Sequence, residues 1–498
     1  MQALLLMTFT LIVAKSIVPV TCLRPYFIES SDIGVSKCTM QGVFGEDHAT
    51  LHLWIRADVD VIEVLEDGKY NQAQLRVKGF FVFESLEQGW EGPQLMQSEE
   101  ALSSFSFQIH IRPHLGSSSA WELTAWDMKK QTKNNVLPFW GNFTLYQLPA
   151  SHSIWEYEVS VEGLDYTCQL VADVHAPPVR MNSNEVDGET SSLEGGQSSD
   201  GTTDYSKALG RPGQVSFLLS PLFGSGVSAY ASVLAWHIAW HQKFGVDIYV
   251  LYVTRQMTEL LENPMIQMMV QKNLLKLIMW IDMPTPLRGT PYAHQVIIYN
   301  HGILSLMAEN SLVIVADLDE YLLTPEPMSI HQVMSNCVEE ERTVSATVAT
   351  LNIKRFNILN KTSADSNVSE LPQWIPQLGD SHTLNSSQWM DLQLPSLAEH
   401  PLKMYTSQAA YRPESGFAKK PIHRPQLCKA IKVHGGFPMD GMQEVQANPA
   451  CARLLHVVNM NQPRMLYPQK MNPIMSKWFW PMKEDNSDGG VSGMQVVR

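Results

Sequence analysis

Basic residues are few in this sequence. Its 36 lysines and arginines are outnumbered by 50 aspartates and glutamates, which gives a formal net charge of -14. Binding to a nucleic-acid backbone requires a basic face, so no nucleic-acid partner is expected. An anionic ligand would have to meet a local basic cluster or a metal ion instead.

Cysteine is also scarce, and no two of the six cysteines form a C-x-x-C pair. They are Cys22, Cys38, Cys168, Cys337, Cys428 and Cys451. This spacing argues against a zinc module and is compatible with one or two disulfides in an oxidising compartment. If Cys22 belongs to a leader, at least one of the other five has no disulfide partner.

The charged residues that usually precede the apolar part of a signal peptide are missing at the N-terminus. Residues 3–14 are apolar apart from Thr8 and Thr10, as in a signal peptide. The whole apolar span of about 20 residues is equally compatible with a membrane anchor that tolerates Lys15 inside it. Residues 1–24 therefore predict a signal peptide or a signal anchor, and both lead to the secretory pathway.

Glycosylation sequons of the form N-x-[ST] agree with that compartment. They begin at Asn142, Asn360, Asn367 and Asn385. Three of the four lie in one polar stretch, and such sequons mark surface loops of secreted proteins.

No internal repeat is visible, but the composition changes along the chain. Residues 40–175 alternate apolar and polar side chains between short turns, which predicts a small β-sandwich-like domain. Its aromatic residues are expected to form the core, with a sugar-binding platform as the alternative. Residues 180–212 are polar and rich in glycine and serine, which is typical of a flexible linker. Residues 483–498 are predicted to be a disordered tail.

The region 213–470 reads as a second, α/β domain. Apolar strands are expected at 215–223, 246–253, 274–283 and 311–323, and helices at 230–245, 256–272 and 292–310. This alternation predicts a parallel sheet covered on both faces, with its ligand at the carboxyl ends of the strands. A polar stretch at 357–424 reads as an insert, and two further strands, each with a histidine, follow it.

The fourth of these strands ends in V-A-D-L-D-E. In an extended chain Asp317 and Asp319 share one face, while Leu318 points into the packing. Two adjacent carboxylates need a cation, and hard oxygen ligands suit Mg²⁺ or Mn²⁺ completed by substrate phosphates. Such an ion acts as a Lewis acid on a departing phosphate. D-x-D is a common sequence, and a solvated strand end is the alternative.

Several motifs occur in an order that resembles glycosyltransferase family 92. They are S-P-L-F-G (220–224), W-H-x-x-x-G (240–245), H-Q-x-x-x-x-N-H (294–301), V-A-D-L-D-E-Y-L (315–322), K-A-I-K-V-H-G (429–435) and A-R-L-L-H (452–456). The resemblance covers residues 213–470. It implies a GT-A-like, Rossmann-type fold, inverting transfer and a nucleotide-sugar donor, with UDP-galactose the best-attested kind.

Carried onto this chain, the resemblance makes Asp319 the main ligand of Mn²⁺ or Mg²⁺ and Asp317 a contact to the metal or to the ribose. A late histidine would complete the site, either His434 or His456. A lone strand histidine is otherwise structural. Glu320 is expected to buttress the site or to form a salt bridge with a neighbour.

Donor contacts are expected from basic and polar residues near the strand ends. The candidates are Arg255, Gln295, Arg424, Lys429 and Lys432, and any of the four charged ones is alternatively a solvated charge. Gly435 and Gly436 would allow a phosphate to approach the backbone closely.

Inverting transfer also needs a general base between the D-L-D-E motif and the late histidines. Asp380, Asp391, Glu399 and Glu414 have suitable positions. Asp391 is preferred because Trp389, two residues earlier, could stack on a sugar, although a solvated loop carboxylate is the alternative. This stretch departs from the family pattern, which leaves the glycan acceptor open.

Two other classes compete with this interpretation. A haloacid-dehalogenase-type phosphatase uses a D-x-D-x-T strand end, but that motif normally ends the first strand, and Tyr321 occupies its threonine position. A non-catalytic glycan-binding protein would also carry a β-rich module. The favoured interpretation is a metal-dependent glycosyltransferase in the Golgi membrane, single-pass and lumenal, with secretion as the alternative.

Overall fold

The structure is a computed structural model. It describes residues 27–29, 34–44, 47–64, 70–85, 108–113, 121–124, 136–148, 155–161, 167–175, 209–220, 227–253, 259–280, 291–339, 345–358, 402, 407–409, 419–457 and 471–473. The predicted segments 1–24 and 483–498, most of the linker and of the insert, Arg255 and Asp391 lie outside these residues. Within them, no helix combines the length and apolar character needed to cross a membrane.

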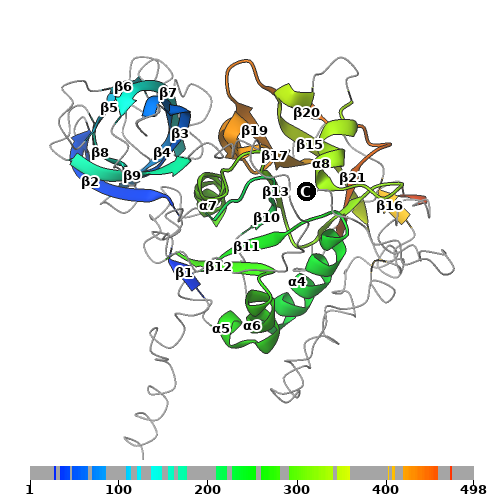
Figure 1. Ribbon diagram of the computed structural model, residues 1–498. Helices are drawn as coiled ribbons and strands as arrows, with labels where there is room; N and C mark the ends of the chain where they lie inside the picture. The colour runs from blue at the N-terminus through cyan, green and yellow to red at the C-terminus, as the bar shows by residue number, and fades with distance from the viewer. Residues whose placement is uncertain are drawn as a thin grey trace, which may run out of the picture.

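The N-terminal region forms one curled sheet (Figure 1). Its strands are β2 (Ser36–Phe44), β3 (Asp47–Val64), β4 (Tyr70–Ser85), β5 (Gln108–Pro113), β6 (Trp121–Thr124), β7 (Val136–Leu148), β8 (Trp155–Val161) and β9 (Thr167–His175). The order is β6-β5-β8-β9-β3-β4-β7, with β2 also on β3. The predicted two-sheet sandwich is therefore wrong. Parallel pairing of β9 with the long strand β3 joins the two halves into a single sheet.

The second region contains the predicted parallel sheet. Strands β10 (Val215–Leu219), β11 (Ile248–Val253), β12 (Leu275–Met279) and β13 (Leu312–Ala316) are parallel, in the order β12-β11-β10-β13. The first strand, β10, thus has neighbours on both sides, so the strand order reverses there. In open α/β sheets such a switch point is where ligands bind. The short strand β1 (Phe27–Glu29) extends the sheet beside β12.

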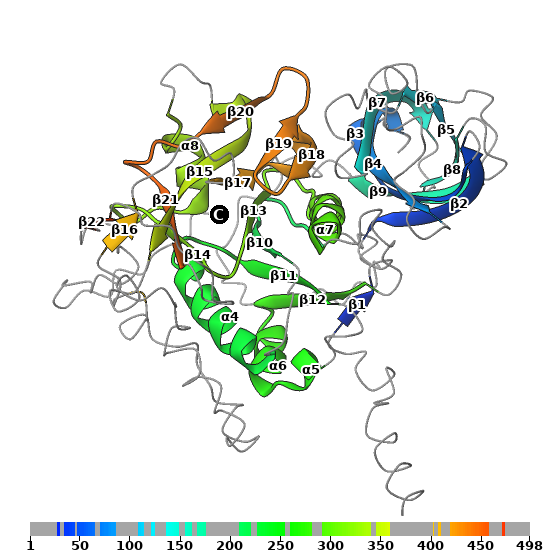
Figure 2. The same cartoon turned by 180° about the vertical axis from the view of Figure 1, so that it is seen from behind.

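Helices cover both faces of this sheet. The helices are α4 (Val227–Gln242), α5 (Glu259–Glu262), α6 (Pro264–Gln271), α7 (Pro291–Ser305) and α8 (Ile330–Asn336). Residues of α4, α6 and α8 share one hydrophobic cluster, and α7 belongs to the other. Seen from both sides, α7 lies between the large sheet and the curled sheet (Figure 2).

The C-terminal half adds further strands and two short 3-10 helices. They are β14 (Glu320–Leu323), η6 (Ser345–Thr347), β15 (Val348–Ile358), β16 (Ser407–Ala409), β17 (Lys419–His423), η11 (Pro425–Leu427), β18 (Cys428–Lys432), β19 (Gly435–Pro438), β20 (Gln443–Gln446), β21 (Arg453–Val457) and β22 (Met471–Pro473). β17 runs antiparallel to β13, and β21 joins β14 to β15. Segments far apart in sequence therefore meet around the acidic motif.

Two disulfides are present, Cys38–Cys168 and Cys337–Cys451. Among the cysteines that the structure describes, Cys428 alone is free, and it is buried. Both expectations from the cysteine spacing are confirmed. One bridge lies within the curled sheet, and the other ties the end of α8 to the residues before β21.

Candidate metal and diphosphate site

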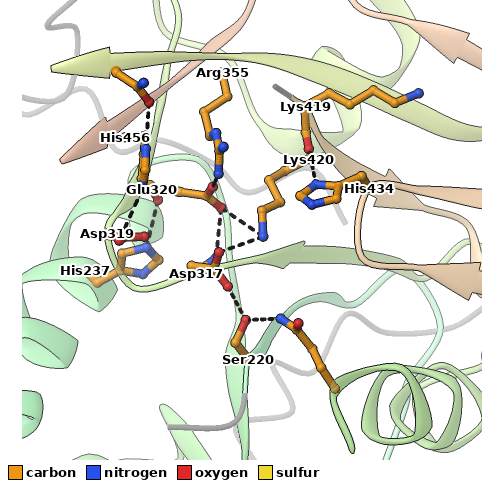
Figure 3. Close-up of polar contacts among 12 residues, drawn as sticks. Ser220, His237, Asp317, Asp319, Glu320, Arg355, Lys419, Lys420, His434 and His456 are labelled. Atoms are coloured by element: carbon orange, nitrogen blue, oxygen red, sulfur yellow. Dashed lines mark hydrogen bonds and ion pairs between the residues drawn. The ribbon is translucent and has the colours of Figure 1, made fainter. Parts of the chain in front are cut away.

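The acidic motif lies in a turn, not in a strand. Strand β13 ends at Ala316, and the next strand begins at Glu320. The Glu320 amide donates to the Asp317 carbonyl at 3.1 Å, which closes the turn. The expectation that Asp317 and Asp319 share the face of an extended strand is therefore wrong, and each carboxylate has its own partners (Figure 3). Leu318 is buried, as predicted.

Asp317 is held by two donors from neighbouring strands. Ser220, which follows β10, donates to its Oδ1, and Lys420 of β17 donates to its Oδ2 at 2.7 Å. Burial disfavours the charged carboxylate, but Lys420 and Ser220 hold the pKa of Asp317 well below its ordinary value. The contact between Ser220 and Asp317 joins the carboxyl ends of β10 and β13, at the switch point of the sheet.

Glu320 organises the basic residues of the site and is completely buried. It accepts from the Asp317 amide at 2.9 Å, from Arg355 Nη1 at 2.8 Å, and lies 3.5 Å from Lys420 Nζ. Both expected roles, buttress and salt bridge, are thus present. Burial opposes the charge of Lys420, yet Asp317 and Glu320 raise the pKa of that lysine above its ordinary value.

Asp319 faces the late strand β21. Its Oδ2 lies 3.3 Å from His456 Nε2, while its Oδ1 is buried without a hydrogen-bond partner. Ligand atoms of Asp319, Glu320 and His456 lie within 4.8 Å of one another. Carboxylate oxygen and imidazole nitrogen are donors that a divalent cation accepts. The unpaired buried oxygen and this donor set fit a metal ion.

The other ring nitrogen of His456 supports the same arrangement. Nδ1 lies 2.7 Å from Asn357 Oδ1, an acceptor, so Nδ1 carries the proton. In neutral His456 the Nε2 lone pair then points at the Asp319 carboxylate. Two acceptors facing each other need a cation between them or a second proton on the ring. Fixing one ring nitrogen in this way is how proteins orient metal-binding histidines.

Other predicted residues take different places. Gln295 donates to Ser220 at 2.8 Å and to the Tyr299 hydroxyl at 2.7 Å, so α7 joins the network around Asp317. His434 is not part of the metal-ligand cluster found among the described residues. It bonds the Lys419 carbonyl at 2.9 Å, and burial together with Lys420 lowers its pKa to about 4.

Two of the remaining basic candidates, Lys429 and Lys432, contact other protein groups. Lys429 pairs with Asp440 at 2.6 Å and lies over Trp140 of the curled sheet. Lys432 lies over Phe437, 3.8 Å from the ring centroid. Burial lowers the pKa of Arg424.

The late glycines face protein atoms. A Cβ at Gly435 would lie 2.6 Å from Glu444, and one at Gly436 would lie 2.5 Å from Thr350. These glycines therefore accommodate close packing of β19 against its neighbours. These contacts account for both glycines without the expected close approach of a phosphate.

Three residues of the site, Ser220, Lys420 and Arg355, were not identified from the sequence. Ser220 was visible only as the first letter of S-P-L-F-G. Lys420 and Arg355 lie in strands whose neighbouring residues are largely buried, and a charged residue inside such a strand is a signal that it has a partner.

The W-H-x-x-x-G motif of α4 anchors the strand that follows the acidic turn. Trp240 Nε1 donates to the Leu322 carbonyl at 2.8 Å, and the Leu322 amide donates to His241 Nε2 at 3.1 Å. His237, one turn earlier in α4, bonds the Glu320 carbonyl at 2.9 Å. Burial, with His237 beside it, holds the pKa of His241 well below its ordinary value, so the ring is neutral and accepts this bond.

Comparison with known families gives a result that agrees with this geometry. The family model of glycosyltransferase family 92 matches residues 219–495. The chain belongs to glycosyltransferase family 92. Its family-92 domain is a glycosyltransferase, which sets aside the phosphatase and the non-catalytic binding protein. A search of curated proteins found no significant match, and neither did a search of solved structures. The curled sheet lies before the matched residues.

Proposed function

We propose that the chain is an inverting, metal-dependent hexosyltransferase that moves galactose from UDP-galactose to a glycan acceptor. The observation that carries the proposal is the buried, unpaired Oδ1 of Asp319 beside His456, at a turn next to the switch point of the parallel sheet. In a GT-A-like fold this is where the donor diphosphate lies. The family membership supplies the reaction class, and the galactose donor comes from the resemblance.

In this proposal Asp319 and His456 hold Mn²⁺ or Mg²⁺, with Glu320 beside them. The ion supplies charge stabilisation for the leaving diphosphate. The carboxylates of Asp317, Asp319 and Glu320 outnumber the two cations Lys420 and Arg355, so the group has one excess negative charge when His456 is neutral. A divalent cation reverses that excess, which makes the site attractive to a diphosphate.

The chain's own residues divide the remaining tasks. Lys420 is almost fully buried between Asp317 and Glu320 and fixes both carboxylates. Arg355 keeps 19% of its side chain exposed, and is the cation of the pair placed to meet a phosphate oxygen. Ser220 and Gln295 orient Asp317 for the ribose.

The general base is proposed to be Asp391, on the basis of its sequence position beside Trp389. A base that deprotonates the acceptor hydroxyl is required for inversion. Asp391→Asn would remove the transfer reaction, while donor binding and metal binding persist. Equal transfer by wild type and variant would move the role to another carboxylate.

Lumenal Golgi localisation is proposed as well. Two disulfides and the sequons support an oxidising compartment. The test is whether tagged protein in cells carries N-glycans and co-localises with Golgi markers. A cytosolic distribution without glycans would contradict the proposal.

Donor hydrolysis tests the proposed reaction directly. UDP or GDP release by the purified chain would be followed with UDP-galactose, UDP-glucose, UDP-N-acetylglucosamine, UDP-arabinose and GDP-sugars, with Mn²⁺ and with chelator. Release from UDP-galactose is expected to need metal and to fall at least about 100-fold in Asp319→Ala, on the order of one lost metal ligand. The control is Asp440→Ala, because that carboxylate is 86% exposed. Metal-independent release would reject the metal, and preference for another donor would reject galactose.

A further inference from the structure

One face of the curled sheet is buried in the protein, although it would be exposed to solvent if the sheet stood alone. Residues 50–59 of β3 are all buried, although successive side chains point to opposite faces of a strand. Trp54 stacks on Phe80 at 5.0 Å between ring centroids, and its ring centroid lies 5.6 Å from that of Trp280, which follows β12 of the large sheet. Trp54, Phe80 and Val82 belong to one hydrophobic cluster with residues of α7. This face is covered by the transferase region.

A buried arginine crosses the same interface. Arg56 Nη1 donates to the Leu304 carbonyl at 2.7 Å and to the Ser305 carbonyl at 3.4 Å, while Nε and Nη2 bond Asp58. Leu304 and Ser305 are the last residues of α7. Carbonyls at a helix C-terminus have no partner within the helix and carry partial negative charge. Arg56, only 2% exposed, therefore caps α7 from the other domain.

Two more basic side chains make similar contacts nearby. Lys78 of β4 is 4% exposed and donates to the Pro425 carbonyl at 2.7 Å. Lys429 of β18 lies over Trp140 of β7, 4.2 Å from its ring centroid. The curled sheet thus reaches α7 and the residues before and within β18.

These two elements support the candidate site. α7 carries Gln295, which bonds Ser220, and Asn300. The Asn300 amide bonds both backbone groups of Ile431 in β18, at 3.1 and 3.0 Å. Movement of α7 would therefore disturb both Ser220 beside Asp317 and the strand β18.

From these contacts we infer that the curled sheet is a fixed structural part of the enzyme that holds α7 and β18 in place. It is not a separable sugar-binding module. The inference rests on the interface alone and is independent of the donor, the metal and the reaction.

Cutting the chain between the two regions tests this. Specific protease sites would be inserted at residues 190–200 and between β1 and β2 of the full-length chain, because β1 pairs with β12 of the large sheet. The folded protein would be cleaved into a short β1 peptide and the two pieces that carry the curled sheet and the transferase region. The disulfides Cys38–Cys168 and Cys337–Cys451 each lie within one piece, and a non-reducing denaturing gel would verify that no other bridge joins the pieces. The two pieces are expected to co-elute in native size exclusion and to unfold in one transition. Separation into two folded pieces with independent transitions would overturn the inference.

A matched pair of arginines isolates the interface. Arg56 bonds Asp58 and α7, whereas Arg76 of the neighbouring strand bonds Asp60 on the surface, where both side chains are partly exposed. Arg56→Met is expected to lower the Tm on the order of 5 °C and to speed hydrogen exchange of α7 amides, because it removes the Arg56 bonds to the last carbonyls of α7 and takes a charged partner away from the buried Asp58. Arg76→Met should change neither. Equal α7 exchange in both variants would contradict the inference.

The double variant Arg56→Met/Asp58→Leu keeps the test usable if Arg56→Met does not fold. It removes both buried charges while leaving the contact with α7 broken. Faster exchange confined to α7 and β18 would support the inference, and unchanged exchange there would overturn it.

Discussion

His456 and Asn357 lie 2.7 Å apart through Nδ1 and Oδ1, and this bond determines which nitrogen of the histidine faces Asp319. Asn357 lies in β15, and its side-chain oxygen bonds the ring of His456. Asn357 therefore affects metal binding by orienting the ring of His456. The two residues come from adjacent parallel strands, β15 and β21, which are paired at these positions.

Replacing Asn357 by leucine should weaken metal binding. The ring of His456 would lose the acceptor that fixes its tautomer, and changes of this kind reduce metal affinity by about 10–100-fold. Isothermal titration with Mn²⁺ would measure the effect, with Asn336→Leu at the exposed end of α8 as control. Unchanged Mn²⁺ affinity in Asn357→Leu would show that His456 does not need this partner.

Lys420→Met should destabilise the fold and impair the site together. The substitution leaves Asp317 and the fully buried Glu320 without their shared cation. Removing one partner of a buried ion pair costs about 3–5 kcal/mol, although Arg355 still pairs with Glu320. Denaturant unfolding would measure the loss, and Lys420→Met/Asp317→Asn should recover part of it. If the double variant is no more stable than the single one, the pair is not coupled.

The position of the acidic motif after a buried strand could be predicted, because a run of apolar residues ended in carboxylates after three β/α units, although the turn itself was not expected. The choice between His434 and His456 could not be made in the same way. Both follow apolar strand residues, and only the antiparallel pairing of Glu320 with His456 brings one of them to the turn. That contact joins residues far apart in sequence, which no local pattern encodes.

The curled sheet shows a different limit. Alternation in β3 and β4 correctly predicted strands, but it did not show that residues 50–59 of β3 are buried on both faces. Arg56 and Lys78 are polar positions of that alternation, and both are buried against backbone carbonyls of the transferase region. A polar residue that is buried by a partner domain has the same sequence signature as one exposed to water.

Lys78 gives the folded protein a dependence on pH. Burial lowers its pKa to about 8, with Arg56 also lowering it and Cys428 and Asp58 opposing this. Between pH 8 and 10.5 the unfolded chain binds the proton while the folded chain releases it, so this lysine makes unfolding less favourable as pH rises. Below pH 8 its burial costs up to about 3 kcal/mol.

Lys78→Met should remove that dependence. Unfolding free energies of wild type and variant, measured from pH 7 to 10, are expected to differ in favour of the variant at pH 7 and to converge as pH rises. A difference that is constant over this range would mean that Lys78 has an ordinary pKa. Lys354→Met is the control, because Lys354 pairs with Glu339, whose side chain is 45% exposed.

The disulfide Cys337–Cys451 should stabilise both the fold and the metal site. It closes a loop of 114 residues, and loops of this size give about 4–5 kcal/mol in the chain-entropy account, although measured values run from about 2 to 5. Cys451 lies just before β21, so its release also frees the strand that carries His456. Cys337→Ser/Cys451→Ser is expected to unfold at lower denaturant and to bind Mn²⁺ more weakly. Cys38→Ser/Cys168→Ser, in the curled sheet, should lower stability while leaving the metal affinity of the folded protein unchanged. Equal Mn²⁺ affinity in the Cys337/Cys451 variant and wild type would show that this bridge does not hold β21 in the position that metal binding needs.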